Sequence, residues 1–383
     1  MNKVGIIGGA LSELKENMEE YSRNELLYTT VKAALESTGL EIGEIDQVIS
    51  ASCDTIDGVS ISNAFAVDDM GAFMKEESKV EEDGLYALSY SFYRMLTGHW
   101  KTCMLVAHGK NSDVGPSFYA NMMCDPFFLR PMGLDIYSAA ALQARRYMEK
   151  NNITEEEVAQ VAVKNLQAGS LNEHTLRQQE VSLKQVMSSP YISTPIKELE
   201  APPVTDGAAV LILATEDLAG VKDRPTAWIS GVGFSQENYY PGYRDLASSS
   251  SCKAAAQMAY REAAIDDPNK ELDFAEISEN FAFYEPLLYE NLGLCSPGEG
   301  MNIFKEGITQ RNGNFPVNPS GGGLCANPIM VTGLIRAWEA YLQLTGQAGR
   351  HQLPKEVKKG LVHTSSGMFL QSNMTVVLTA DRD

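Results

Sequence analysis

Hydrophobic and polar positions follow one another along the chain with two different periods, which predict strands and helices in turn. The short apolar runs 4–7 and 45–51 have strand length and read as strands buried on both faces. The segment 25–37 instead carries apolar residues at helical spacing and stops at Gly39. Strand, helix and strand at these lengths predict a βαβ unit and therefore an α/β fold.

A second helical pattern, 84–97, is apolar over much of its circumference, so we expect a largely buried helix, followed by a strand at 103–107. Three acidic residues, Glu81, Glu82 and Asp83, precede this helix. They are interpreted either as an acidic cap stabilised by the helix dipole or as a source of a catalytic carboxylate. Both interpretations stay open on the sequence.

The segment 109–133 carries aromatic residues, methionines and prolines without clear periodicity. A long irregular segment in a compact protein is usually a lid or a binding surface, so we expect it to wall an apolar pocket or to meet another subunit. Helices are predicted next over 136–150 and 154–167. Thr154 and Glu157 form the capping-box pattern at the start of the second helix.

Composition narrows the class of protein. The 383 residues are 44% hydrophobic and 21% charged, which suits a large core in two subdomains. A net charge of −19 disfavours a nucleic-acid partner. The six cysteines show neither a CxxC pair nor a Cys/His cluster of metal spacing, so we expect a reduced, cytoplasmic chain without its own zinc. No segment approaches the roughly 20 apolar residues of a membrane span.

The stretch 317–333 is the most distinctive in the chain. It contains Asn-Pro-Ser followed by three glycines, and glycines let the backbone approach another group closely. The stretch resembles the third motif of the thiolase superfamily, a glycine-rich loop followed by Gly-His-Pro. Here Ala326-Asn327-Pro328 stands at that place, so the histidine of the motif is replaced by Asn327.

Other stretches carry the same resemblance over nearly the whole chain. The Asp-Gly-Ala-Ala strand within 201–214 is similar to a thiolase core strand, and 278–281 stands where the family writes Asn-Glu-Ala-Phe or His-Asp-Cys-Phe. The stretch 292–300 resembles sterol-carrier-type thiolases, and 364–367 lies at the fourth motif without its Cys-x-Gly-Gly-Gly form. The resemblance implies the thiolase fold, with two similar βαβαβαββ halves in α-β-α-β-α layers. We place the halves at 1–218 and 225–383.

The resemblance also shows what is missing. Thiolases carry a nucleophilic cysteine at the N-terminus of a central helix, where the dipole lowers the thiol pKa. Counting back from Thr97-Gly98 places this position at Glu81 or Glu82, and no cysteine lies between Cys53 and Cys103.

Candidate site residues follow from the resemblance. Cys325 is the candidate substitute nucleophile or acid, Asn327 would donate to a thioester oxygen, and His363 would be the acid/base. Each has a plainer alternative: Cys325 as a small core thiol, and His363 as a merely hydrogen-bonded histidine. The remaining candidates are carboxylates, Glu279 and Glu81, and residues expected to contact the pantetheine or phosphates of coenzyme A, Ser248, Ser249, Ser320, Gly321 and Gly322. A serine N-cap explains Ser248 and Ser249 about as well.

Three functions are compatible with the sequence. The first is an atypical thiolase-like enzyme that makes or breaks a carbon–carbon bond in a 3-oxoacyl-CoA by CoA-dependent acyl transfer. The second is a retro-aldol lyase on a 3-hydroxyacyl-CoA, which needs no nucleophilic cysteine and would use Tyr284, Glu279 or His363. The third is a non-catalytic subunit.

The resemblance further implies partners. Similar chains work beside a small accessory protein with a zinc ribbon and an OB-fold, and such two-component thiolases serve anaerobic degradation of aromatic acids, including one that acts on an aroylsuccinyl-CoA. The segment 109–133 would contact that partner or an acyl group. A homodimer formed through the first-half sheet is expected as well.

Overall fold

The computed structural model of the protein describes residues 3–219 and 224–381. Its principal strands form one nine-stranded sheet in the order β3-β2-β4-β7-β1-β8-β11-β10-β9. The strands are β1 (Val4–Leu11), β2 (Gln47–Ala51), β3 (Glu76–Val80), β4 (Thr102–Lys110), β7 (Asp206–Thr215), β8 (Ala227–Gln236), β9 (Phe274–Ile277), β10 (Lys359–Ser366) and β11 (Ser372–Thr379). The runs predicted at 4–7, 45–51 and 103–107 all coincide with strands of this sheet.

The sheet is symmetric about the contact between β1 and β8. These two strands meet antiparallel through two residue pairs, Gly5 with Trp228 and Ile6 with Ala227. Counted outward from this contact, β7, β4, β2 and β3 follow β1, and β11, β10 and β9 follow β8. Val317 pairs parallel with Ala275 of β9, in the place that β3 takes beside β2. The two halves therefore repeat one strand order, which confirms the expected duplicated fold.

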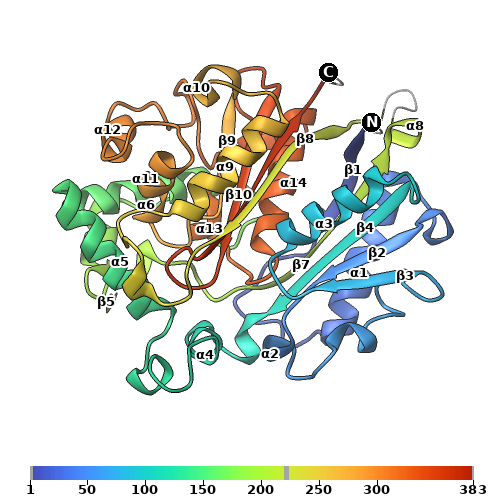
Figure 1. Ribbon diagram of the computed structural model, residues 1–383, viewed down its shortest axis with the longest axis horizontal. Coiled ribbons are helices and arrows are strands. Elements are labelled where there is room, and N and C mark those ends of the chain that lie inside the picture. The colour runs from blue at the N-terminus through green and yellow to red at the C-terminus, as the bar shows by residue number, and fades with distance from the viewer. Residues whose placement is uncertain (1–2, 220–223, 382–383) are drawn as a thin grey trace.

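Two helices lie between the halves of the sheet, and two cover its outer faces (Figure 1). The inner pair is α3 (Gly84–Leu96) and α14 (Thr332–Thr345), which share one hydrophobic core with strands of both halves. The outer pair is α1 (Arg23–Thr38), packed on the first half, and α9 (Ser250–Glu262), packed on the second. The result is the α-β-α-β-α layering of the thiolase fold. The apolar pattern at 84–97 is explained, because nine of the 13 residues of α3 are buried.

The remaining helices pack mainly beside the second half (Figure 1). They include α5 (Ile136–Asn151), α6 (Glu155–Gly169), α7 (Leu183–Ser188), α11 (Tyr284–Asn291), α12 (Gly300–Lys305) and α13 (Gly322–Cys325). A small hairpin of β5 (Tyr191–Ser193) and β6 (Ile196–Lys197) lies among them. Thr154 caps α6, and Glu157 returns the bond to its backbone, as the capping-box pattern predicted.

The segment 109–133 is more regular than its sequence suggested. It contains the helix α4 (Pro116–Met122), which begins after Gly115 at φ +80° and has Pro116 in its first turn. Proline suits this position because its missing N–H would have no intrahelical partner there. The helix escaped prediction because seven residues are too short to show an apolar period.

The boundary between the halves was expected between residues 218 and 225. The structure describes α8 (Glu216–Ala219) and resumes at Arg224, whereas 220–223 lie outside the described residues, as do 1–2 and 382–383. The division into 1–218 and 225–383 therefore stays a prediction. In the described part of the chain, no helix combines the length and apolar character that a membrane crossing requires.

Candidate active site

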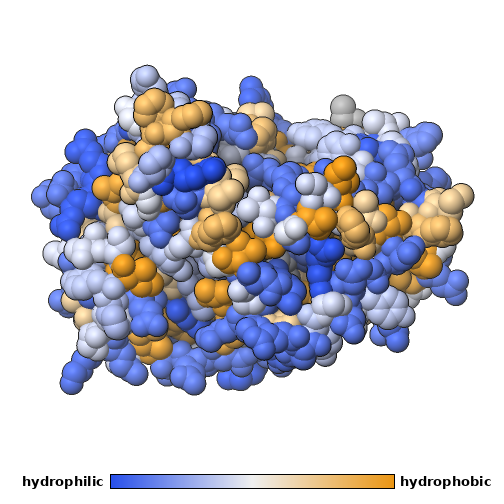
Figure 2. Space-filling model, turned by 90° about the horizontal axis from the view of Figure 1, so that it is seen from below, coloured by the Kyte–Doolittle hydropathy of each residue, from blue (hydrophilic) through white to orange (hydrophobic). Residues whose placement is uncertain are grey.

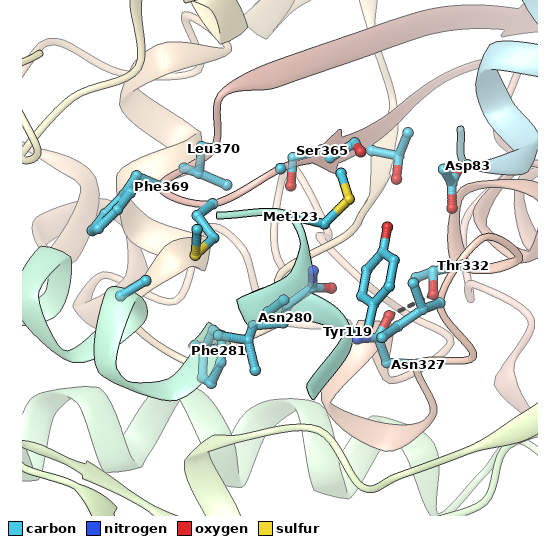
Figure 3. A pocket seen from close by; sticks show the side chains of 18 of the residues that line it. Asp83, Tyr119, Met123, Asn280, Phe281, Asn327, Thr332, Ser365, Phe369 and Leu370 are labelled. Carbon is cyan, nitrogen blue, oxygen red and sulfur yellow. Dashed lines mark hydrogen bonds between the residues drawn. The ribbon is translucent and has the colours of Figure 1, made fainter. Parts of the chain in front are cut away.

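A pocket opens where the N-termini of the two central helices meet (Figure 3). Including its mouth, it encloses about 830 Å³. Its walls come from α4, the start of α5, the segments 280–284 and 327–332, and the loop 364–370. Asp83 brings the one formal charge found among the described lining residues, and neither cysteine nor histidine is among them.

Asp83 links the two central helices. Its side chain is 5% exposed, and one carboxylate oxygen accepts a hydrogen bond from the Leu85 N–H of α3 at 3.0 Å. The other oxygen accepts from the Gly333 N–H of α14, also at 3.0 Å. Gly333 must lack a side chain, because a Cβ there would lie 2.0 Å from the Asp83 carboxylate. The acidic-cap interpretation is therefore confirmed for Asp83, which caps α3.

Burial raises the pKa of Asp83 to about 7, although the N–H bonds from Gly333 and Leu85 oppose the rise. A carboxyl group with a pKa near neutral pH can both take and return a proton at working pH. The electrostatics of this position therefore suit a general acid/base. Asp83 directly follows Glu81 and Glu82, where the thiolase nucleophile was expected.

Asn327 presents a carboxamide to the same pocket. Its Oδ1 accepts a hydrogen bond from the Thr332 hydroxyl at 2.5 Å (Figure 3), and its backbone N–H donates to Thr205 at 3.2 Å. No described residue accepts a bond from the Asn327 Nδ2 group. The amide N–H groups therefore have no protein acceptor among the described residues, and the donor role expected of Asn327 stays a prediction.

Asn280 supplies a second carboxamide from another segment (Figure 3). Its Oδ1 is buried, and no described residue hydrogen-bonds to it. A buried amide without a partner is costly unless a ligand or water completes it. Asn280 was not among the residues predicted from the sequence, because the polar residues of the family motif correspond to Ser278 and Glu279. The signal was there, since the family writes alanine or cysteine where this chain has an amide.

Two tyrosines complete the polar wall. Tyr119 comes from α4 and Tyr284 from the start of α11, and burial raises the pKa of both phenols well above the usual value. Both hydroxyls are therefore neutral at pH 7 and can donate a hydrogen bond. Tyr284 was a candidate of the aldol hypothesis, whereas Tyr119 was grouped only with the irregular segment.

His363 lies next to the pocket but faces away from it. Its neighbour Thr364 lines the pocket, and successive residues of a strand point to opposite faces. His363 Nε2 lies 2.9 Å from Asn373 Oδ1 and 3.7 Å from the Cys252 Sγ. Burial lowers the pKa of this imidazole to about 4, so it is neutral at pH 7.

Glu279 lies behind the glycine loop. Its carboxylate accepts hydrogen bonds from the Gly323 N–H at 3.1 Å and the Leu324 N–H at 3.2 Å, and from two asparagine amides. A Cβ on Gly322 would lie 2.1 Å from this carboxylate. The glycines thus allow the backbone to approach the protein's own Glu279. The bare amides that the sequence suggested for a ligand are occupied by this side chain.

Ser320 and Gly321 are buried in the same loop. The Ser320 hydroxyl donates to Glu276 at 2.6 Å and accepts from Arg336 at 2.7 Å. A Cβ on Gly321 would lie 2.7 Å from Gly169. Neither residue lines the pocket.

Cys325 is fully buried on the far side of the loop, with its thiol 3.3 Å from the Asn165 carbonyl. Burial raises the pKa of this thiol to about 12. Glu81 is exposed instead: its carboxylate accepts from the Asp54 N–H at 2.7 Å and pairs with Lys79 at 2.6 Å. Neither residue lines the pocket.

The two serines lie near α9. The Ser248 hydroxyl donates to Asn291 at 3.0 Å, and Ser249 accepts from the Cys252 N–H as the N-cap of α9. Ser249 also donates to the Leu370 carbonyl at 3.3 Å, which belongs to the pocket loop. Of the ten site residues predicted from the resemblance, Asn327 lines the pocket, and so does Tyr284, which the aldol hypothesis named. The roles assigned to all of these residues stay predictions.

Asp83 and the two carboxamides meet over the ends of paired inner helices, within a duplicated five-layer fold. This arrangement defines a thiolase-fold protein whose pocket holds a carboxyl group in place of a thiol. The Thiolase C-terminal domain-like family matches residues 234–380. Over 376 residues, the chain is 27% identical to an acetyl-CoA acetyltransferase of Methanothermobacter thermautotrophicus, covering 96% of this chain and 97% of that protein. These matches support the thiolase superfamily for this chain.

Two further similarities are informative. The chain is 26% identical over 231 residues to the benzoylsuccinyl-CoA thiolase subunit BbsB of Thauera aromatica, covering 59% of each protein. The solved structure of an Ltp2-ChsH2(DUF35) aldolase superposes with a TM-score of 0.84 at 22% identity, covering all of this chain and 98% of that one. This likeness shows the shared fold. In the part of the chain that the structure describes, no three His, Cys, Asp or Glu side chains gather as a metal site.

Proposed function

We propose that the protein breaks or forms a carbon–carbon bond beside a CoA thioester by aldol chemistry, without an acyl-enzyme intermediate. The observation that supports this most is Asp83, a buried carboxyl group with a pKa near 7, at the N-terminus of α3 in a pocket lined by no thiol among the described residues. The substrate class is a 3-hydroxyacyl-CoA in the cleavage direction.

The residues present suit the two tasks of this reaction. Asp83 takes the proton of the 3-hydroxyl group, the C2–C3 bond breaks, and an aldehyde or ketone leaves. The electron pair passes into the thioester as an enolate, which is then protonated at C2 to give the shorter acyl-CoA. The amide groups of Asn280 and Asn327 donate to the enolate oxygen, where negative charge develops.

Acyl transfer of the thiolase kind, named in two of the relatives, is the second candidate. It requires a thiolate that takes the acyl group. Burial raises the pKa of all six thiols, so the thiolate form of each is disfavoured at neutral pH. Cys325 remains the cysteine of the glycine loop that a search for an acyl-enzyme must examine.

We also propose an accessory partner. One relative is named as a subunit, and the aldolase of similar fold carries the names of two components. On the face where α4 lies, apolar side chains gather at the surface (Figure 2). The exposed large apolar side chains of the segment 109–133 are Phe118, Met122, Met123, Phe127, Phe128 and Met132. A small protein with an OB-fold and a zinc ribbon is the partner we propose for this surface.

A homodimer is proposed through the first half of the sheet. Strand β3 lies at its edge and pairs with β2 alone among the described strands. Large apolar side chains before it are exposed, among them Phe65, Phe73 and Met74. An unpaired edge beside apolar residues is suited to pairing with a second chain. All six cysteines are free thiols, which agrees with the proposed cytoplasmic location.

Product analysis tests the proposed reaction. The chain is incubated with 3-hydroxy-3-phenylpropionyl-CoA, and benzaldehyde and acetyl-CoA are measured by chromatography without added CoA. Equal amounts of both products are expected from the wild type and a large loss from Asp83→Asn. Asp267→Asn alters an exposed aspartate that caps α10 (Pro268–Glu271) and serves as the matched control.

Turnover that depends on free CoA, with a 3-oxoacyl-CoA as substrate, would favour acyl transfer. A chain inactive with and without a partner would indicate a non-catalytic subunit.

A further inference from the structure

The candidate pocket has two chemically distinct ends. Its polar end holds Asp83, Thr332, Asn327 and Asn280, which we assigned to the reacting atoms. Its other end is apolar: Phe369 and Leu370 lie away from Asp83, Thr332 and Asn327 (Figure 3), and Phe369 clusters with Ala139 and Met368. An acyl group that reaches the polar end must place its far side against these apolar side chains.

The described side chains that line this pocket include no lysine, arginine or histidine. Two arginines, Arg244 and Arg130, approach the lining segments from behind and donate some of their terminal N–H groups to backbone, whereas the Nε of each has no partner among the described residues. Arg244 donates to the Met368 and Phe369 carbonyls, each at 3.2 Å. Arg130 donates to the Met122 carbonyl at 2.6 Å and the Cys124 carbonyl at 3.0 Å. These cations hold loops in place, and neither of them is among the described residues that line the pocket.

Nearby carboxylates add repulsion. Asp83 lines the pocket, Glu82 precedes it in the chain, and Asp135 caps α5 just before the lining residue Ile136. An anionic group on the acyl chain would lose its water, find no cation among the described lining side chains and lie near the Asp83 carboxyl group. Burying an unpaired carboxylate is among the most unfavourable changes that binding can impose.

We infer that this pocket selects acyl groups that are apolar and uncharged, aryl groups included, and excludes acyl groups that carry a free carboxylate. The inference rests on the proposed aldol function and narrows its substrate. A benzoylsuccinyl group carries a carboxylate in addition to its ring, so the pocket fits the aryl part of such a molecule and not the succinyl part.

A matched pair of thioesters tests the inference. One is 3-hydroxy-3-(4-isopropylphenyl)propionyl-CoA, and the other carries a carboxylate in place of the isopropyl group, which has a similar shape. The neutral thioester is expected to show a kcat/KM at least about 100-fold higher. Equal values, or a preference for the carboxylate, would overturn the inference.

Variants at Met368 place a charge in the apolar end. Met368→Lys should narrow the ratio between the two thioesters at least about tenfold, because an ammonium group pairs with the added carboxylate. Met368→Gln removes the methionine without adding charge and should leave the ratio near its wild-type value. A lysine variant that behaves like the glutamine variant would contradict the assigned position of the acyl group.

Binding separates this inference from the proposed reaction. If neither thioester is cleaved, the aldol proposal fails, and the two affinities are then compared by isothermal titration calorimetry. A Kd at least about tenfold lower for the neutral thioester would still support the uncharged pocket. Equal affinities would overturn it whether or not the chain is catalytic.

Discussion

The Asp83 carboxylate accepts a hydrogen bond from the Gly333 N–H at 3.0 Å, across 250 positions of sequence. This bond ties the N-cap of α3, in the first half, to the first turn of α14, in the second. The two helix N-termini therefore point their free N–H groups at one buried carboxyl group. The same carboxyl group faces the pocket, so the junction between the halves and the proposed chemistry depend on one side chain.

Asp83→Asn is expected to lower kcat/KM for a 3-hydroxyacyl-CoA by about 10² to 10⁴, the usual contribution of a general acid/base. The fold should persist, because asparagine is also a good N-cap. Steady-state kinetics measure the loss, and circular dichroism checks the fold. The wild-type rate should rise with pH through about 7, since the carboxylate is the form that accepts the proton. A variant with unchanged kcat/KM would remove Asp83 from the mechanism.

Stability should also respond to pH through Asp83. Burial raises its pKa from 3.8 to about 7, so the folded state binds this proton more tightly than the unfolded state does. The folded state therefore loses stability as the pH rises from about 4 to about 7, by roughly 4 kcal/mol at the limit. Asp83→Asn removes this dependence. Denaturant unfolding at pH 5 and pH 8 measures the free energy of unfolding of both proteins. Relative to the wild type, the variant should be more stable at pH 8 than at pH 5. A constant difference would contradict the raised pKa.

Cys325→Ala should retain catalysis within about threefold, because the thiol lies outside the pocket. Loss of one small buried side chain should cost on the order of 1 kcal/mol in the free energy of unfolding. Mass spectrometry after incubation with substrate should find no acylated peptide containing this residue. A hydroxylamine-sensitive acyl group on Cys325 would restore the acyl-transfer mechanism.

Thr332→Val should reduce kcat about tenfold with a smaller effect on KM, because the hydroxyl that holds Asn327 Oδ1 is lost while the shape is kept. Thr332→Ser keeps the hydroxyl and should restore most of the rate. Asn327→Ala, which removes the donor itself, should cost about 10² or more. Equal rates for the valine and serine variants would show that Thr332 does not orient Asn327.

Gly322→Ala should destabilise the protein by several kcal/mol, since its Cβ would overlap the buried Glu279 carboxylate at a φ of +67°. Gly346→Ala is the matched control. Gly346 has a φ of +71° and open space around its Cβ position, so the control measures backbone strain alone, at about 1 kcal/mol. Thermal or denaturant unfolding compares the two. Similar losses of unfolding free energy in the two variants would mean that the overlap with Glu279 does not contribute to the destabilisation.

Much of the architecture was predictable because it depends on local patterns. The capping box at Thr154 and Glu157, the buried helix at 84–97 and the strands all follow from periods and caps that neighbouring residues set. The glycine loop was recognised by its amino-acid sequence, but the sequence did not show which group its backbone amides bind. Only the fold shows that the Glu279 carboxylate accepts hydrogen bonds from the backbone N–H groups of Gly323 and Leu324.

The sequence by itself predicted the duplicated thiolase fold and the absence of any cysteine between Cys53 and Cys103, and it singled out Asn327 as a candidate. Tertiary structure decided which polar groups share the pocket. His363 and Thr364 are adjacent in sequence but face opposite sides of β10, and Cys325 lies two residues from Asn327 yet is buried elsewhere. Asp83, Asn280 and Asn327 come together because two sheet halves fold around one pair of helices. Side-chain direction and burial are properties of that packing, and a linear sequence does not contain them explicitly.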